Sequence, residues 1–326
     1  MKKKILNILK KYEGEYISGE RLSEELGITR AGIWKHMKSL KEAGYEIESV
    51  SNKGYKLIGT PDKIDEEEVS PFLKTKYIGR TFNHHEEIDS TNTEAKRECA
   101  KNIIEGMVVT AEAQTKGKGR LGRQWESPKS TGIWMSIVLT PEISPVLAPK
   151  TTIIGAAAVY SALRDMGIDV GIKWPNDIVM AGKKVCGILT EMNAEIDRVN
   201  YIILGIGINV NMDEFPEELN EKATSLKVQL SEEVSRKELT AKVLNYLEYY
   251  YDLFKSTGSI KEVINICRKG SVLLGKEVRV INGGQETICT ALDIDEDGEL
   301  IVKYKDGSLH KVLSGEVSVR GIYGYV

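Results

Sequence analysis

One short stretch of the chain combines glycines with positive charges. Between Lys116 and Arg123, eight residues include three glycines and four lysines or arginines. Glycine lets a backbone approach a neighbouring group closely, and lysine and arginine commonly bind phosphate. The stretch predicts a flexible basic loop that folds over an anionic ligand; the alternative is a solvated turn between two strands.

The glycines of this loop also match the spacing of a dinucleotide-binding fingerprint. Gly117, Gly119 and Gly122 fit G-x-G-x-x-G, a pattern that requires a strand before it and a helix after it. A strand is expected over 107–112, but a β-like run over 133–139 follows the glycines. The context therefore argues against a Rossmann fold.

A second group of polar side chains lies where a strand runs into a helix. The strand is expected over 83–88 and the helix over 93–104, with Asp89, Ser90, Thr91 and Asn92 between them. These side chains can cap the helix, and they can also direct hydroxyls, an amide and backbone N–H groups into a pocket; both roles can hold together.

Two further turns and one lysine are also candidates for the site. The sequence Lys-Trp-Pro-Asn-Asp over 173–177 separates strands expected at 170–173 and 178–180. Lys184 begins an apolar strand expected over 184–191, where a buried ammonium needs a partner or a chemical role. A strand over 201–204 is expected to end in Gly-Ile-Gly-Ile-Asn over 205–209, where the glycines again permit close approach.

The first sixty residues indicate a small basic domain. Ser18 and Thr29 are in position to cap two short helices, over 20–26 and 30–41, joined by a tight turn. A hairpin over 45–58 follows, so the segment predicts a winged helix-turn-helix whose second helix enters a DNA major groove. A protein-docking helical hairpin is the alternative. Residues 1–60 carry 12 Lys/Arg against 8 Asp/Glu, a balance of +4, whereas the remaining 266 residues carry 33 against 40, a balance of −7. This asymmetry favours DNA, with the helix-turn-helix at 19–38 and contacts from Arg30, Lys35, Lys38 and Lys53.

Taken in order, these motifs resemble those of biotin–protein ligases. With the winged helix-turn-helix in front, the chain is similar to the bifunctional family whose members also repress biotin genes. The resemblance implies an α+β fold in three parts: a winged helix-turn-helix over 1–62, a mixed-sheet α/β domain of the biotin/lipoate ligase type over 63–270, and an SH3-like β-barrel over 271–326. Capping motifs at 235–238 and 259–262 and turn signals between short strands after 271 agree with these limits.

The resemblance also implies a reaction in two steps. The biotin carboxylate attacks the α-phosphate of ATP to give biotinyl-AMP, and a lysine of a biotin carboxyl carrier protein then attacks the mixed anhydride. It implies catalytic roles for Lys184, Arg120 and Lys118. It implies a biotin site made of Ser90, Thr91, Asn92, Gln114, Lys118, Gly119, Arg120, Lys184 and Gly205. It implies an adenylate site made of Gly117, Arg123, Trp125, Asn176, Asp177, Gly207 and Asn209, with Asp177 near Mg²⁺.

One residue departs from the family pattern, and two other functions stay open. Lys118 stands where the family commonly has arginine, which keeps the charge and loses the planar fork. The resemblance implies operator DNA as a second partner and a homodimer promoted by biotinyl-AMP, through an edge strand near 187–196. The alternatives are a ligand-sensing regulator without ligase activity and a ligase for lipoate or another acyl group.

Composition adds limits to these functions. The chain has 326 residues, and 41% of them are hydrophobic and 29% charged, as in soluble proteins. The sequence leads us to expect a cytoplasmic protein with no membrane span or signal peptide. Its four cysteines are far apart and are expected to be reduced. The four histidines lack metal-ligand spacing, so no structural zinc is expected.

Overall fold

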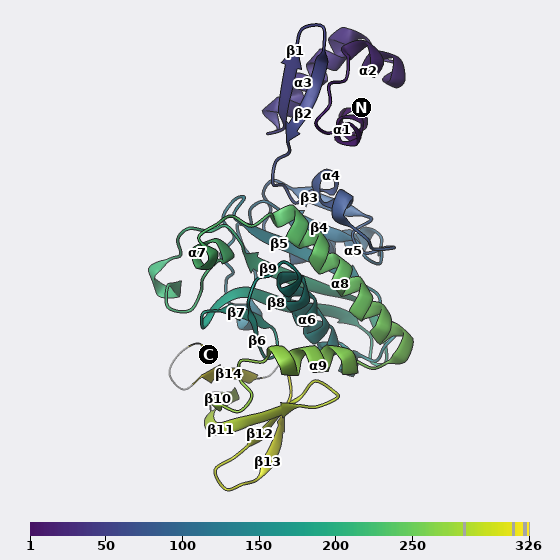
Figure 1. The fold of residues 1–326 in the computed structure, drawn as a ribbon. Helices are drawn as coiled ribbons and strands as arrows, with labels where there is room; N and C mark the ends of the chain where they lie inside the picture. Colours follow the sequence, from purple (N-terminus) through teal and green to yellow (C-terminus); the bar gives the residue numbers. More distant parts are fainter. Residues whose placement is uncertain (283–284, 315–316, 322–324, 326) are drawn as a thin grey trace. The chain divides into compact units, whose positions relative to one another are not determined.

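The computed structural model describes residues 1–282, 285–314, 317–321 and 325 (Figure 1). Contacts divide the chain into two units, Met1–Lys63 and Ile64–Val326. The first boundary falls one residue from the expected one. The boundary expected after residue 270 separates two sheets within the second unit rather than two units of their own.

The first unit is a winged helix-turn-helix. It contains α1 (Lys2–Lys11), α2 (Gly19–Leu26), α3 (Arg30–Glu42) and a hairpin of β1 (Glu46–Val50) and β2 (Gly54–Gly59). The capping residues act as predicted, because Ser18 accepts a hydrogen bond from the Arg21 backbone and Thr29 accepts one from the Gly32 backbone. Ile5, Leu22, Ile33, Met37 and Leu57 are fully or almost fully buried and form the core of this unit.

A seven-stranded mixed sheet organises the second unit. Its strand order is β3-β4-β5-β9-β8-β7-β6, and only the β3–β4 pair is parallel among these neighbours. The strands are β3 (Phe82–His85), β4 (Val108–Ala111), β5 (Gly132–Leu139), β6 (Gly171–Lys173), β7 (Asp177–Met180), β8 (Lys183–Ala194) and β9 (Val199–Asn209).

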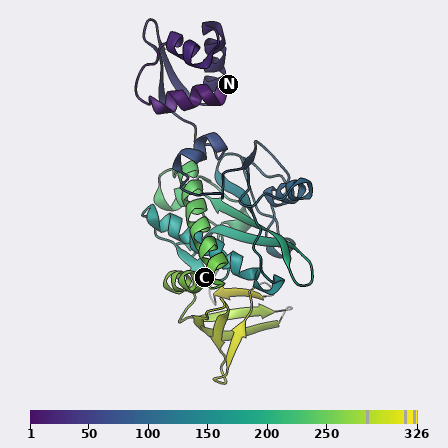
Figure 2. The ribbon, with the colours of Figure 1, turned by 90° about the vertical axis from the view of Figure 1, so that its right-hand side faces the viewer.

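Helices cover both faces of this sheet. On one face lie α6 (Pro149–Asp165) and α8 (Arg236–Thr257), and on the other lies α5 (Thr91–Lys101) (Figures 1 and 2). The segment 145–165, which contains α6, is long and apolar enough to cross a membrane by length and composition, but 61% of its most apolar window is buried within the protein. It is therefore explained as a core helix.

Side chains along β9 alternate between an apolar face and a face of glycines and asparagine. Ile202, Leu204, Ile206 and Ile208 point into the large core beneath α6 and α8. Gly205, Gly207 and Asn209 alternate with them and so face the opposite side. The expected strand over 201–204 was too short, because these glycines continue the ladder with β5 and β8 instead of ending it.

A second, antiparallel sheet forms the C-terminal part. Its order is β13-β12-β11-β10-β14. The strands are β10 (Glu277–Asn282), β11 (Gln285–Ile294), β12 (Leu300–Lys303), β13 (Leu309–Val312) and β14 (Val317–Gly321). It contacts the rest of the second unit through the ion pair of Asp293 with Arg268 of helix α9 (Lys261–Gly270), at 2.7 Å, and through a hydrogen bond of 2.9 Å from the indole of Trp174, which follows β6, to the Gly298 carbonyl. The turn expected at 282–284 lies partly outside the described residues.

The remaining elements are short, apart from one helix. They are α4 (Glu66–Val69), α7 (Leu226–Leu230) and α9 (Lys261–Gly270), together with single 3₁₀ turns at Ser70–Phe72, Arg120–Gly122, Pro145–Leu147 and Glu217–Leu219. Of the two capping motifs predicted, Ser235 caps α8 by accepting a hydrogen bond from the Glu238 backbone. The motif predicted at 259–262 was wrong, because Ile260 is the N-cap of α9 and makes no side-chain capping bond. The loop glycines are followed by a three-residue 3₁₀ turn at 120–122 and not by the helix that a Rossmann fold requires.

Candidate active site

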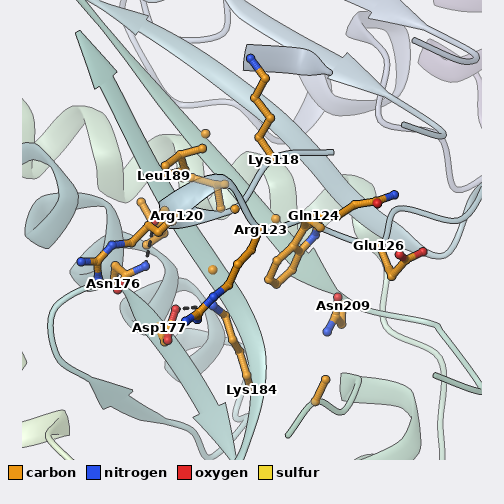
Figure 3. Close-up of a pocket in the computed structure, with 18 of the residues that line it drawn as sticks. Lys118, Arg120, Arg123, Gln124, Glu126, Asn176, Asp177, Lys184, Leu189 and Asn209 are labelled. Carbon is orange, nitrogen blue, oxygen red and sulfur yellow. Dashed lines mark hydrogen bonds and ion pairs between the residues drawn. The ribbon is translucent and has the colours of Figure 1, made fainter. Parts of the chain in front are cut away.

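A cavity of about 850 Å³ lies over the glycine-bearing face of the large sheet. Strands β5, β8 and β9 form its floor, and the basic loop after β4 covers part of it (Figure 3). All of the site residues expected from the sequence line this cavity, with Gly117 as the exception: Ser90, Thr91, Asn92, Gln114, Lys118, Gly119, Arg120, Arg123, Trp125, Asn176, Asp177, Lys184, Gly205, Gly207 and Asn209. Segments up to 119 residues apart in the chain therefore meet in one place.

Glycines in the floor make room for two side chains. A methyl group at Gly205 would lie 2.2 Å from Oδ1 of Asn92, and one at Gly207 would lie 2.6 Å from the indole nitrogen of Trp125. A methyl group at Gly187, opposite Gly207 in the ladder, would lie 2.9 Å from the Trp125 ring. The glycines are thus needed for close approach by side chains. Gly117 serves the same purpose outside the cavity, because a methyl group there would lie 2.3 Å from the Trp125 carbonyl oxygen.

A β-bulge turns Lys184 toward the cavity. The pairing of β7 with β8 shifts so that Ile178 faces Cys186 while Val179 faces Lys184. Val185 is the extra residue, and both it and Cys186 are fully buried in the core. Without the bulge, strict alternation would place Lys184 and Gly187 on opposite faces. Sequence patterns predicted the strand but gave no sign of this bulge.

Lys184 and Asp177 form an ion pair at the edge of the floor. The Lys184 ammonium lies 2.5 Å from Oδ1 of Asp177 and 5.1 Å from the centre of the Trp125 ring. Tyr325 donates a hydrogen bond of 2.5 Å to Oδ2 of the same carboxylate. The predicted need of a half-buried lysine for a partner is therefore met by Asp177.

The basic loop presents its cations at different depths. Arg120 reaches inward and donates a hydrogen bond of 2.9 Å to Oδ1 of Asn176, and burial lowers the pKa of its guanidinium. Figure 3 shows Lys118 directed away from Asp177 and Lys184, and its side chain is exposed. The structure therefore brings Arg120 to the centre of the cavity and leaves Lys118 at its edge.

The Asp89–Asn92 turn does not use its hydroxyls as helix caps. Ser90 is the N-cap of α5 but makes no side-chain capping bond. Thr91 instead donates from both its backbone and its hydroxyl to Oε1 of Gln114, at 2.9 and 3.1 Å. Gln114 in turn donates to the Ser127 hydroxyl at 2.8 Å. Of the two possibilities left by the sequence, the pocket-facing one is observed.

Several lining residues were not assigned a role from the sequence. They are the cations Lys173, Lys222 and Arg279 and the aromatic Tyr325. Lys173 is 4% exposed, and its ammonium lies 3.4 Å from the centre of the Tyr325 ring. Its position inside the Lys-Trp-Pro-Asn-Asp motif was a usable signal, whereas Arg279 and Tyr325 come from the C-terminal part and carry no local pattern. Together with the predicted cations they outnumber the acidic lining residues Glu126, Asp177 and Glu221, so positive charge prevails in the cavity.

The residues of the cavity fit a metal that arrives with its own ligands. Within the described part of the chain, no group of three or more metal-binding side chains comes together. Asp177 is a single carboxylate, already held by Lys184 and Tyr325. Magnesium commonly binds through one or two carboxylates plus substrate phosphates. Asp177 therefore fits the expected role only as one carboxylate beside a phosphate-bound Mg²⁺.

The first unit presents a separate candidate surface for nucleic acid. Arg30, Lys35 and Lys38 on α3 are exposed, as is Lys53 in the turn between β1 and β2. Arg30 is paired with Glu20 of α2 at 2.7 Å, and Lys53 lies over the Tyr16 ring at 5.5 Å. Trp34 is 60% exposed on the same helix, so it is not a core residue.

Comparison with known protein families divides the chain in the same way. The Biotin/lipoate A/B protein ligase family matches residues 85–209. A helix-turn-helix domain family matches residues 2–56, and the biotin protein ligase C-terminal domain matches residues 273–320. The central match contains the turn at 89–92, the basic loop and both glycines of β9.

Individual relatives match along nearly the whole chain. The bifunctional ligase/repressor BirA of Bacillus subtilis (strain 168) is 36% identical over 322 residues, which cover 98% of each chain. Its counterpart in Escherichia coli (strain K12) is 29% identical over 313 residues, covering 94% of each. Among solved structures, a biotin protein ligase from Aquifex aeolicus in complex with biotin and ATP is 32% identical, with a TM-score of 0.66. That comparison covers 74% of this chain and 99% of the other.

Proposed function

The chain belongs to the family of bifunctional biotin ligase/repressors, and from this premise we propose that it makes biotinyl-AMP from biotin and ATP, transfers biotin to an acceptor lysine, and represses biotin genes. The observation that carries the proposal is the meeting of the turn at 89–92, the basic loop and Lys184 in one cavity. The turn at 89–92 suits a polar head group. The basic loop and Lys184 suit a carboxylic acid that is being joined to a phosphate.

The positive charge of the cavity supports adenylate formation. The nucleophile is a carboxylate and the target is a phosphate, so both reactants and the departing pyrophosphate are anions. Lys184 lies where it can bind the acid and stabilise the charge that develops on the phosphoryl oxygens. Asp177 holds that ammonium in place, at 2.5 Å, and Arg120 adds a second cation from the loop.

The loop and Trp125 supply a second requirement, the exclusion of water. A mixed anhydride hydrolyses if water reaches it, so the adenylate must be covered until the acceptor amine arrives. Trp125 already packs over Gly187 and Gly207. We propose that Trp125 moves to pack on the adenine, with Asn176 and Asn209 near the nucleotide, and that Lys118 approaches the ligand as the loop closes.

Magnesium is proposed as part of the nucleotide substrate. Bound to the phosphates, it would neutralise charge on the departing pyrophosphate. Asp177 is the carboxylate of the cavity placed closest to the reacting lysine, so it is proposed to lie beside the metal.

Mass spectrometry of an acceptor domain tests the ligase activity. Incubation with ATP, Mg²⁺, biotin and a biotin carboxyl carrier domain should add the mass of one biotinyl group to the carrier. Parallel reactions replace biotin with lipoate or octanoate, and omit the carrier to measure pyrophosphate release alone. Absence of both the mass gain and the pyrophosphate would refute the proposal.

Repression is proposed to require a homodimer promoted by biotinyl-AMP. Strand β7 pairs with β8 as far as Gly187 and Asn176 bonds the backbone of Ile188, so within the described chain residues 189–194 of β8 leave one edge open. Met192 on this edge is 50% exposed, and Ile196 just beyond the strand is 102% exposed. An open edge with exposed apolar side chains supports pairing with a second copy. Sedimentation with and without biotinyl-AMP tests this, and a Met192→Lys, Ile196→Lys variant should stay monomeric.

Operator binding can be tested without knowing the sequence of the operator. Selection from a random duplex library with the full protein and biotinyl-AMP should yield a two-fold symmetric site. Lys35→Ala should weaken binding to the selected duplex and reduce the salt dependence by about one counterion. Failure to enrich any sequence would reject repression and leave the ligase activity unaffected.

The other functions considered are not favoured. A regulator without ligase activity would not need two cations, Lys184 and Arg120, held in the cavity. Relatives that span nearly the whole chain are bifunctional ligase/repressors. We also propose a cytoplasmic location, which both proposed activities and DNA as a partner support.

A further inference from the structure

A chain of hydrogen bonds runs behind the turn at 89–92, from the protein surface to the cavity wall. It begins at an ion pair, passes through an amide and two hydroxyls, and ends at a second amide. Its members, in order, are Lys96, Glu191, Asn92, Ser136, Thr91 and Gln114. Neither Glu191 nor Ser136 lines the cavity, so neither is expected to touch a ligand.

The charged end of this chain fixes the orientation of the Asn92 amide. Glu191 accepts a hydrogen bond of 2.5 Å from the Lys96 ammonium and one of 2.8 Å from the Asn92 amide nitrogen. An ionised carboxylate can only accept hydrogen bonds. The nitrogen of Asn92 must therefore face Glu191, and its oxygen must face the other way, toward Ser136.

Ser136 transmits this orientation because it has one proton and two neighbours. Its hydroxyl oxygen lies 2.5 Å from Oδ1 of Asn92 and 2.8 Å from the Thr91 hydroxyl. The amide oxygen can only accept, so it receives the Ser136 proton. The Thr91 hydroxyl then receives no proton from Ser136. Its own proton goes toward Gln114 or Ser136, which leaves its lone pairs for the cavity.

Loss of Glu191 would allow the hydrogen bonds between Asn92, Ser136 and Thr91 to run in the opposite direction. If the Asn92 amide turned its nitrogen toward Ser136, the Ser136 proton would have to go to Thr91. One lone pair of Thr91 would then be occupied, and its proton would be confined to Gln114. The cavity wall would offer one acceptor fewer. The charge on Glu191 thus decides, through Asn92 and Ser136, how many acceptors Thr91 presents.

We propose that Glu191 is a positioning residue that sets the Thr91 hydroxyl as an acceptor for a ring N–H of the cyclic urea of biotin. The inference rests on the proposed ligase function and on the turn at 89–92 holding the polar head group. A cyclic urea carries N–H donors beside its carbonyl, so it needs acceptors in fixed places. Buried hydrogen-bonding groups discriminate strongly against ligands that cannot pair with them.

The backbone below supports a fixed amide. Gly205 faces Ser136 in the β5–β9 ladder, and a methyl group at Gly205 would lie 2.2 Å from Oδ1 of Asn92. Asn92 is 4% exposed and Ser136 is fully buried. The amide is therefore held by Glu191 on one side, by Ser136 on another and by the sheet beneath.

The test uses the pyrophosphate-release reaction of the full protein at saturating ATP, with biotin as the variable substrate. Glu191→Leu removes the acceptor at similar size, and Ser136→Ala removes the hydroxyl that transmits the order. Glu191→Leu should raise the KM for biotin about tenfold, as expected for roughly one hydrogen bond, and leave kcat within about twofold. Ser136→Ala removes the proton that would otherwise occupy Thr91, so on its own it should leave the KM close to that of the wild type. Glu191→Gln has a single amide oxygen, which the Lys96 ammonium would hold, so its N–H2 would face Asn92 and the KM should rise as in Glu191→Leu.

The decisive measurement is the double variant. Glu191 and Ser136 share no hydrogen bond in the described structure, so independent roles predict that Glu191→Leu raises the KM equally with serine or alanine at position 136. A relay predicts that Glu191→Leu adds nothing once Ser136 is alanine. A biotin analogue methylated at the ring nitrogen that donates to Thr91 should lose affinity for the wild type and bind the Glu191→Leu variant no worse than it binds the wild type.

Folding effects are separated by a matched control. Glu98 of α5 has 25% side-chain exposure and pairs with Lys101 at 2.8 Å, which closely matches the 24% exposure of Glu191 and its pairing with Lys96. Glu98→Leu should alter thermal stability as much as Glu191→Leu does and leave the KM for biotin unchanged. A full tenfold effect of Glu191→Leu in the Ser136→Ala background would overturn the relay, as would a Glu191→Gln variant with the KM of the wild type. Both results presuppose an active wild type, whereas an inactive wild type would overturn the ligase function itself.

Discussion

The floor and the covering loop of the cavity differ in how their polar groups are satisfied. In the floor and the adjoining turn, Thr91, Asn92, Asn176 and Asn209 are almost fully buried, and each is bonded within the protein. In the loop, Lys118 and Arg123 are exposed. A group whose partners are already in place costs little to reorganise on binding, whereas an exposed cation must be ordered. The floor therefore accounts for selectivity and the loop for capture of the anion.

Removal of the charge at the edge of the floor should have the largest effect. Lys184→Met should lower kcat for pyrophosphate release by roughly 100-fold or more, since it deletes a preorganised cation at the reacting oxygens. Rapid-quench measurement with saturating biotin and ATP checks this. Lys183→Met is the control, because the Lys183 ammonium binds the Asn220 carbonyl outside the cavity. A decrease of less than tenfold for Lys184→Met would remove it from the chemistry.

The next effect should come from filling the floor itself. Gly205→Ala places a methyl group against Asn92 and should raise the KM for biotin about tenfold or more, since overpacking costs about 1–3 kcal/mol. Steady-state kinetics and thermal unfolding measure both consequences. Gly155→Ala adds a methyl group beneath the same sheet, 3.2 Å from Leu204 and away from the cavity, and should leave the KM for biotin unchanged. Equal KM changes in the two variants would mean that the floor is not selective.

Changes in the loop should be smaller and should depend on salt. Arg123→Ala should raise the KM for ATP roughly twofold to fivefold at low salt and less at 0.5 M salt, since exposed charges are screened. Arg120→Lys loses the planar fork that holds Asn176, so its defect should persist at high salt. The KM for ATP of each variant, relative to the wild type, is measured at low salt and at 0.5 M salt. The same salt dependence in both variants would contradict the different burial of Arg120 and Arg123.

The smallest effect should be a dependence of stability on pH. Burial raises the pKa of Glu191, but the hydrogen bonds from Lys96 and Asn92 outweigh it and lower the pKa below the ordinary 4.5. The contribution of its charge to the free energy of unfolding is therefore complete above about pH 4.5 and lost as pH falls through the lowered pKa. Urea unfolding should show wild type more stable than Glu191→Gln by less than about 1 kcal/mol at pH 7, with the difference shrinking at pH 3.5. A difference independent of pH would contradict this assignment.

The sequence predicted which helices and strands form better than it predicted how far the strands extend. Caps at Ser18, Thr29 and Ser235 and the periodicity of the helices depend on neighbours in the chain, and those predictions were confirmed. The extension of β9 through Gly205 was missed, because isolated glycines usually interrupt a strand. Here neighbouring strands pair with them on both sides.

The candidate site was predictable where residue types are unusual and hidden where they are ordinary. Glycines beside cations and a lysine in an apolar strand stand out in any sequence. Ser136 was visible only as one polar residue in the apolar run 133–139, and its partner Asn92 lies 44 residues away. Arg279 reaches the cavity from β10 of the second sheet, and Tyr325 reaches it from the segment after β14. Such contacts depend on topology, which local patterns do not contain.

The bulge at Val185 makes chain length critical at one point of the molecule. A deletion of this residue would leave every chemical group of the reaction in the sequence and still rotate the ammonium of Lys184 into the apolar layer under α6. Conversely, an insertion elsewhere in β8 would shift Glu191 away from Asn92. In alignments with other chains, a gap between positions 184 and 187 is therefore a stronger sign of lost activity than a conservative exchange at either end.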